Sequence, residues 1–135
     1  MEYLLHHIGI AVKNITKSYK YYEAAFGYKN ECEVYCQDEN LHAMFIKNRN
    51  WERIELIEKI DENRASPIDS ILKCRGGGIY HHCYEVNNLT EVCHELRTQG
   101  FLTLKRAEYA AQGFKCIYLI APDNQLIELL QYQHD

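Results

Sequence analysis

The chain has 135 residues, and this length is typical of one compact domain. Its net charge is −4 and it has no block of basic residues, so we expect no nucleic-acid partner. No apolar run reaches the roughly 18 residues that a membrane-spanning helix needs. The first residues also lack the charged-then-apolar pattern of a secretory signal. We therefore expect a cytoplasmic protein without a membrane partner, with its six cysteines reduced.

The first half of the chain predicts one strand, one helix and three further strands. A strand is expected over Leu4–Val12, where side chains alternate between two faces. A helix is expected over Ile15–Phe26, because apolar residues recur there every three or four positions. Asn14 or Thr16 is its expected cap, and Gly27 its end. The further strands are expected over Tyr28–Tyr35, Leu41–Lys47 and Trp51–Glu58.

The second half repeats this order after a connection over about 61–75, in which Ser66-Pro67 predicts the start of a short helix. A strand is expected over Ile79–Val86, and a helix over Leu89–Gln99 with Asn88 or Thr90 as its cap. The last strands are expected over Leu102–Ala107, Lys115–Ala121 and Gln125–Gln131. The sequence thus predicts a single α+β domain over 1–135, made of two βαβββ modules at about 1–60 and 76–135.

Two kinds of ionisable residue recur with the same spacing as the modules. His7 and His81 lie 74 positions apart, and each stands five residues before a valine. Glu55 and Glu128 lie 73 positions apart, and each stands between aliphatic neighbours on a predicted strand. Strand alternation directs the neighbouring histidines, His6 and His82, to the other face of their strands. The duplication therefore selects four residues as one candidate constellation.

The chemistry of these four residues suits a divalent metal. A carboxylate among aliphatic neighbours is costly to bury unless a partner compensates its charge. Two imidazoles and two carboxylates suit Zn, Ni, Co, Mn or Fe(II), with the remaining positions open to water or substrate. A simpler interpretation also stands, in which the histidines pack within their strands and the glutamates face solvent. Because all four positions follow the same repeat, the metal-site interpretation is favoured over the simpler one.

Four strand-like segments carry a resemblance to a known family. They are His7–Val12, Ile54–Ile57, His81–Val86 and Leu126–Leu129, and they resemble the signature strands of the vicinal oxygen chelate superfamily. That superfamily includes glyoxalase I, methylmalonyl-CoA epimerase, bleomycin-resistance proteins and extradiol dioxygenases. The resemblance covers nearly the whole chain and implies that the paired βαβββ modules form a curved, incomplete β-barrel around a metal. The ligands that it implies are His7, Glu55, His81 and Glu128.

Within the superfamily, the chain is most similar to methylmalonyl-CoA epimerase and to glyoxalase I-like proteins. The segments that resemble the epimerase are Glu55–Glu58, Ser66–Ile68, Gly76–His82 and Leu126–Tyr132. The epimerases often have Gln at the position of Glu55, whereas glyoxalase I usually has Glu there. Some epimerases also offer a carboxylate from the strand that matches Leu41–Ile46, where this chain offers only His42.

The resemblance implies a metal-dependent isomerase or epimerase that removes a proton next to a thioester or carbonyl group, with an acyl-CoA or related compound as substrate. Glu128 is the expected base, and Glu55 is the symmetric candidate for the other face. One alternative is a lactoylglutathione lyase, as in glyoxalase I, which applies the same chemistry to a hemithioacetal. Another is a metal-free protein that binds or sequesters a small molecule. A homodimer is expected by analogy only.

Overall fold

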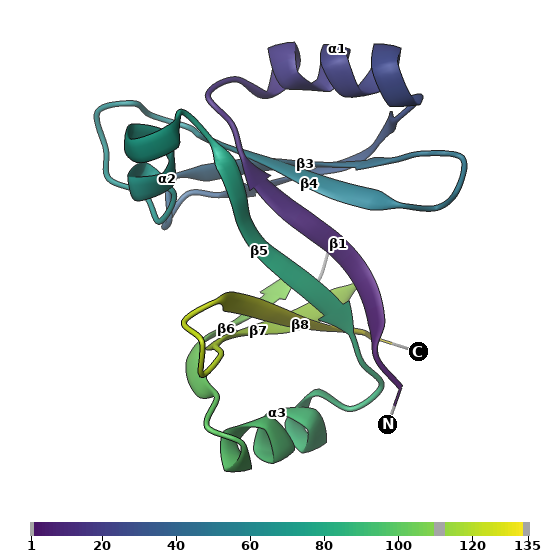
Figure 1. The fold of residues 1–135 in the computed structure, drawn as a ribbon, viewed down its shortest axis with the longest axis vertical. Coiled ribbons are helices and arrows are strands. Elements are labelled where there is room, and N and C mark those ends of the chain that lie inside the picture. The colour runs from purple at the N-terminus through teal and green to yellow at the C-terminus, as the bar shows by residue number, and fades with distance from the viewer. Residues whose placement is uncertain (1, 110–112, 134–135) are drawn as a thin grey trace. The chain divides into compact units, whose positions relative to one another are not determined.

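The computed structural model describes residues 2–109 and 113–133, and within them it contains eight strands and three helices (Figure 1). The first half holds β1 (Leu4–Ala11), α1 (Ile15–Phe26), β2 (Lys29–Cys36), β3 (Leu41–Lys47) and β4 (Arg53–Lys59). The connection holds α2 (Asp69–Arg75), and the second half holds β5 (Gly78–Glu85), α3 (Leu89–Thr98), β6 (Leu102–Tyr109), β7 (Phe114–Ile120) and β8 (Leu126–Tyr132). The predicted α+β class and the repeated βαβββ order are confirmed. None of the described helices is long and apolar enough to cross a membrane.

The chain divides into two compact units. We call His7–Tyr80 the N-terminal unit, and Met1–His6 together with His81–Asp135 the C-terminal unit. The boundary falls inside β1 and inside β5, so each of these two strands contributes residues to both units. The assignment of the whole chain to a single domain stays a prediction.

The N-terminal unit is a sheet covered by α1. Its strands follow the order β2-β3-β4-β1, with β3 antiparallel to both β2 and β4, and β1 parallel to β4. Helix α1 covers one face of this sheet, as Figure 1 shows. The core between them consists of buried Ile15, Tyr28, Met44, Ile46 and Leu56. Because β1 and β4 are parallel, α1, β2 and β3 together form the long connection between them.

The C-terminal unit repeats this arrangement. Its strands follow the order β5-β8-β7-β6, with β5 parallel to β8, and α3 packs against one face. Its helix-facing core contains Val92, Cys93, Ile117, Leu119 and Leu129, among other residues. Three of the six cysteines, Cys83, Cys93 and Cys116, are buried in this unit, where their thiols pack as small hydrophobic groups.

Both long helices begin with the same cap. The Asn14 side-chain oxygen accepts a hydrogen bond from the Lys17 N–H at 2.9 Å, and the Asn88 oxygen accepts one from the Glu91 N–H at 3.0 Å. These bonds satisfy amides that the first helical turn cannot pair internally. Of the two predicted candidates for each cap, the asparagine is the one used. Gly27, with φ of 73°, ends α1 as predicted.

Each helix start is also tied to the last strand of its module. The Ile15 N–H donates to the Glu58 carboxylate at 2.7 Å, and the Leu89 N–H donates to the Gln131 side-chain oxygen at 2.8 Å. These donors lie 74 positions apart and these acceptors 73 positions apart, so the repeat preserves the contact although the acceptor residue differs. The tie fixes each helix over its own sheet.

Helix α2 begins later than predicted. The sequence placed its start at Ser66-Pro67, but the helix runs from Asp69. The Asp69 carboxylate accepts hydrogen bonds from both the Ser66 N–H and the Ser66 hydroxyl, at 3.0 and 2.8 Å. These bonds hold residues 66–68 in a turn that precedes the helix.

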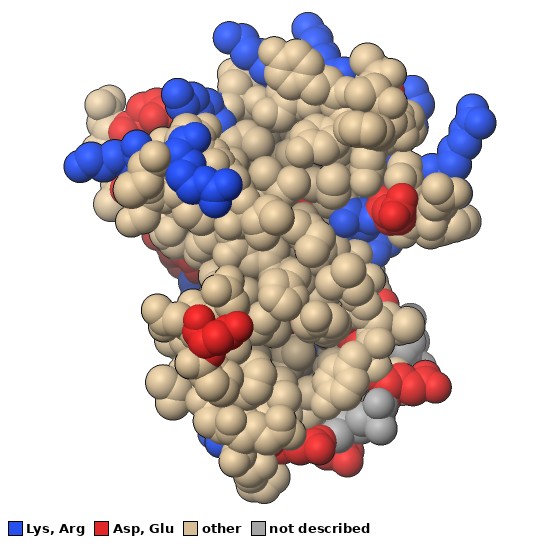
Figure 2. Space-filling view, in the orientation of Figure 1, with Lys and Arg blue, Asp and Glu red and all other residues tan. Residues whose placement is uncertain are grey.

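Charge is distributed unevenly between the two units. The N-terminal unit has eleven Lys and Arg and eleven Asp and Glu, whereas the C-terminal unit has four and eight. In Figure 2, Lys and Arg gather over α1 and α2, while most of the few charged residues visible on the C-terminal unit are Asp and Glu. An anionic ligand therefore finds its more favourable potential on the N-terminal unit.

The repeated cap leads to a stability prediction. We expect Asn88→Ala to lower the free energy of unfolding by about 1 kcal/mol, because the Glu91 N–H loses its acceptor. Urea denaturation measures this change. The adjacent, exposed Asn87 has no side-chain hydrogen bond to any residue that the structure describes, so Asn87→Ala is the matched control. Equal losses in the two variants would contradict the capping role.

Candidate active site

The first histidine–carboxylate pair lies in the N-terminal unit. His7 Nε2 is 3.3 Å from Glu55 Oε1, the His7 side chain is fully buried, and the Glu55 side chain is 12% exposed. The parallel register of β1 and β4 sets Gly9 opposite Glu55. Because His7 and Gly9 share a strand face, the imidazole and the carboxylate lie on the same side of the sheet.

The second pair lies in the C-terminal unit and repeats the first. His81 Nε2 is 3.0 Å from Glu128 Oε1, with side-chain exposures of 1% and 5%. The parallel register of β5 and β8 sets Cys83 opposite Glu128. Cys83 lies 74 positions after Gly9, so the two pairs arise from the same strand pairing.

An aromatic ring contacts each histidine edge-on. The Phe45 ring lies 5.0 Å from the His7 ring at 82°, and the Tyr118 ring lies 5.8 Å from the His81 ring at 81°. Phe45 stands opposite Glu55 on β3 and β4, and Tyr118 stands opposite Glu128 on β7 and β8. The sequence analysis missed both rings, although their spacing of 73 positions could have revealed them.

Each pair has the donor chemistry of a metal site. An imidazole nitrogen and a carboxylate oxygen lie within 3.3 Å of one another and are largely shielded from water. A carboxylate held in such a place needs a compensating charge or donor, and a divalent cation meets that need. The structure thus pairs His7 with Glu55 and His81 with Glu128. Their union in one four-ligand site stays a prediction.

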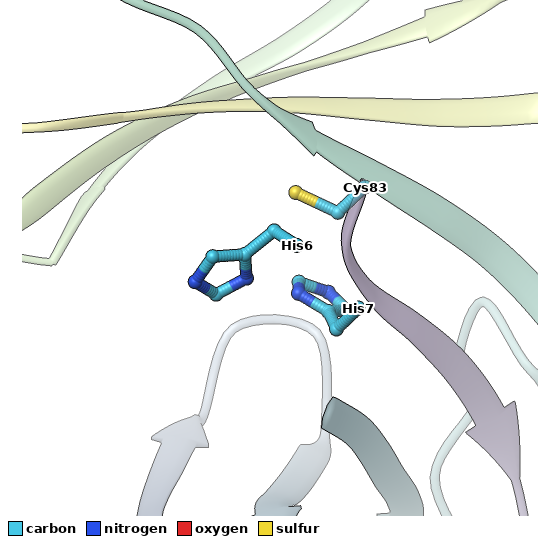
Figure 3. Close-up of side chains that lie close together, drawn as sticks. All are labelled: His6, His7 and Cys83. Carbon is cyan, nitrogen blue, oxygen red and sulfur yellow. The ribbon is translucent and has the colours of Figure 1, made fainter. Parts of the chain in front are cut away.

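Each of the two strands β1 and β5 has one more histidine, His6 or His82, and its surroundings are different. His6 Nε2 is 2.6 Å from the Tyr132 hydroxyl oxygen, and the His6 ring approaches the Cys83 thiol within 4.8 Å. Figure 3 shows His6 and Cys83, with His7 next along β1. His82 stands opposite Ile127, which belongs to the core under α3. His82 therefore lies on the other face of the sheet from Glu128.

His42 is held in an ion-paired cluster. Its ring nitrogens lie 2.9 Å from a Glu58 oxygen and 2.8 Å from a Glu33 oxygen, and its ring stacks on Tyr35 at 4.2 Å. Strand alternation puts His42 and Phe45 on opposite faces of β3, and Phe45 is the residue that contacts His7. His42 therefore does not supply a second base at the His7 pair.

These pairs lead to a prediction for the metal-free protein. We expect His81→Ala to lower the free energy of unfolding by about 3 kcal/mol, because it removes the imidazole beside a buried carboxylate. The double variant His81→Ala/Glu128→Leu should recover most of the loss. Denaturation in the presence of a chelator measures both.

The control for this prediction is the neighbouring histidine of the same strand. His82→Ala removes a half-buried ring that faces away from Glu128, so we expect a smaller loss. If the double variant were no more stable than His81→Ala alone, the pair would not account for the effect.

Known proteins resemble this chain in sequence and in fold. The model of the glyoxalase/bleomycin resistance protein/dioxygenase superfamily matches residues 6–118. The chain belongs to this superfamily. An ethylmalonyl-CoA/methylmalonyl-CoA epimerase of Cereibacter sphaeroides is 30% identical over 132 residues, which are 94% of this chain and 96% of that protein. Glyoxalase I of Saccharomyces cerevisiae is 24% identical over 150 residues, which are 98% of this chain and 46% of that protein.

A solved structure shows the same fold. The crystal structure of methylmalonyl-CoA epimerase from Mycobacterium tuberculosis superposes with a TM-score of 0.83 at 25% sequence identity, and the match covers 96% of this chain and 88% of that one. The predicted superfamily, the glyoxalase fold and the likeness to epimerases and glyoxalase I are therefore confirmed. The two relatives described above, an epimerase and a glyoxalase I, are enzymes.

Proposed function

We propose that this protein is a metal-dependent isomerase that epimerises an acyl-CoA by removing the proton next to its thioester. The observation that carries this proposal is the buried histidine–carboxylate pair present in both units. The 30% identical relative named as an ethylmalonyl-CoA/methylmalonyl-CoA epimerase supports the substrate class. The predicted cytoplasmic location and homodimer remain predictions.

We infer that His7, Glu55, His81 and Glu128 together hold one divalent metal, which would be Ni, Co, Mn, Zn or Fe. Their two imidazoles and two carboxylates form a donor set that these cations accept. A metal bound there supplies positive charge that stabilises the negative charge developing on the thioester oxygen. The two histidine rings are fixed by strand packing and by the Phe45 and Tyr118 edges, which pre-orients their nitrogens.

The carboxylates are the proposed bases. Glu128 takes the α-proton of the substrate, and its burial keeps bulk water from competing for that proton. Inversion requires a proton to be donated from the other face, and Glu55, which would have to be in its protonated form, is the symmetric residue for that step. His42 is excluded from it, because the ring lies on the opposite face of β3 from Phe45 and is engaged with two carboxylates.

A second candidate function is lactoylglutathione lyase activity. Glu55 favours it, because a carboxylate at this position resembles glyoxalase I, whereas epimerases often have Gln there. The structure gives Glu55 the same pairing with His7 that Glu128 has with His81, so neither carboxylate is distinguished by its partner. Parallel assays with methylmalonyl-CoA and with the methylglyoxal–glutathione hemithioacetal separate the two functions. Binding of either compound without turnover would instead favour the sequestering protein.

A groove in the N-terminal unit suits the phosphates of a coenzyme A group. It has a volume of about 330 Å³, and its lining includes Lys13, Lys17, Tyr21 and the turn Gly76–Gly78. A Cβ on Gly77 would lie 2.7 Å from the Ala11 carbonyl oxygen, so only glycine allows this close approach of the turn to β1. We propose that the two ammonium groups bind the diphosphate and that the exposed Tyr21 ring lies against the adenine.

The proposed bases lead to an isotope-exchange prediction. In D2O, the wild-type protein should exchange the α-proton of one methylmalonyl-CoA enantiomer and also form the other enantiomer. We expect Glu128→Gln to slow exchange by at least about 100-fold, the usual contribution of a general base. Glu85→Gln, on the same strand as His81, is the matched control and should leave exchange unchanged.

The role of Glu55 has a separate readout in this experiment. If Glu55 returns the proton, Glu55→Gln should keep exchange but lose inversion of the enantiomer. Full inversion by Glu55→Gln would remove Glu55 from the mechanism. Full exchange by Glu128→Gln would contradict the assignment of the base.

The groove leads to a prediction about substrate binding. We expect Lys13→Ala/Lys17→Ala to raise KM for an acyl-CoA about tenfold with little change in kcat, because two phosphate contacts are lost. Lys20→Ala is the control, since this exposed lysine of α1 does not line the groove. Steady-state kinetics measure both variants. An unchanged KM in the double variant would show that this groove does not bind the coenzyme A group.

A further inference from the structure

A second cavity lies in the C-terminal unit, on the face of the sheet opposite Glu128. Its volume is about 440 Å³, within the range of small-molecule sites. Its walls are mostly apolar and include Leu96, Phe101, Ile127 and Leu129, between α3 and β8. Ile127 and Leu129 alternate with Glu128 along β8, so this cavity is distinct from the proposed active site.

The two units have different side chains at this place in the repeat. Leu96 and Phe101 correspond by their spacing to Tyr22 and Tyr28 of the N-terminal unit, 74 and 73 positions earlier. There the two tyrosine rings meet edge to face at 5.8 Å, and Tyr28 is 7% exposed. At this place the N-terminal unit packs two tyrosine rings together, whereas the C-terminal unit has Leu96 and Phe101 beside the cavity.

Five polar side chains line the open cavity, those of Tyr3, His82, Tyr84, Asp123 and Gln125. The side chains of Tyr3, His82 and Tyr84 have no hydrogen-bond partner among the residues that the structure describes. The His82 and Tyr84 rings meet at 77° and 5.4 Å, which holds both against the cavity wall. Apolar walls with a few convergent polar groups are the usual construction of a ligand site. Because these three side chains are partly exposed and are not engaged within the described part of the protein, a ligand in the cavity can form hydrogen bonds with them.

Charge narrows the class of ligand. Asp123 is the one charged residue among the described residues that line the cavity. The C-terminal unit as a whole has twice as many acidic as basic residues. An anion is therefore disfavoured, whereas a neutral or cationic group is accepted. The rings of Tyr3, His82, Tyr84 and Phe101 offer faces and edges to an aromatic ligand or to a cation.

We propose that this cavity is a second ligand site, which binds a small planar aromatic molecule, neutral or cationic, with one or two hydrogen-bonding groups. The proposal is independent of the catalytic role of Glu128 and of any bound metal. In this proposal His82 forms the hydrogen bond to the ligand, and Phe101 and Tyr84 contact the aromatic ring of the ligand.

Nuclear magnetic resonance titration of the full chain tests this site with three related probes. Indole and tryptamine should shift the His82 and Tyr84 ring resonances in a saturable manner, with a Kd of about 1 mM or below. Indole-3-acetate, which is anionic, should bind at least about tenfold more weakly. Intermolecular Overhauser contacts should connect the indole ring of the bound probes to Phe101.

Two variants complete the test. Leu96→Tyr reproduces the residue found at the equivalent position of the N-terminal unit and should abolish the shifts, whereas Leu104→Tyr adds the same ring at an exposed position on β6 and should bind as wild type does. Absence of saturable shifts and of Overhauser contacts with every probe would overturn the proposal. Equal binding of indole-3-acetate would overturn the ligand class, and unchanged binding by a folded Leu96→Tyr variant would overturn the location.

Discussion

The structure depends on the placement of two carboxylates in water-poor surroundings beside imidazoles. Glu128 is 4% exposed, between the buried apolar residues Ile127 and Leu129, and an ionised group there is costly without a partner. His81 Nε2 lies 3.0 Å from the Glu128 carboxylate, and His7 Nε2 lies 3.3 Å from the Glu55 carboxylate. The parallel strand pairs that bring these residues together are thus constrained in register, since a shift of one residue would turn each carboxylate to the helix side.

Both modules of the repeat contain the same contacts that fix the register of the parallel strands. The Val12 N–H donates to the Ile57 carbonyl at 2.8 Å, and the equivalent Val86 N–H donates to the Leu130 carbonyl at 2.8 Å. The cap and the helix tie are repeated in the same way. The two units differ in the hollows proposed to bind ligands. The lysine-lined groove belongs to the N-terminal unit, and the open apolar cavity belongs to the C-terminal unit.

Most elements could be predicted from local patterns, because strand alternation, helical spacing and caps act over a few residues. The start of β4 was misplaced: Trp51, with φ of 66°, completes a turn, and the strand begins at Arg53. The repeat selected four candidate residues, which the structure places in two histidine–carboxylate pairs. Their aromatic neighbours Phe45 and Tyr118 were not predicted, since cross-strand contacts depend on a register that the sequence does not display.

The central claim is that two pairs serve one metal ion, and metal content per chain tests it most directly. After reconstitution with Ni, Co, Mn or Zn and removal of excess, the wild-type chain should retain about one ion, since four ligands complete a single site. His7→Ala and His81→Ala should each lose it, because each removes a ligand of the same ion. Retention of about two ions by the wild type, with one left in each variant, would contradict the account by showing two separate sites.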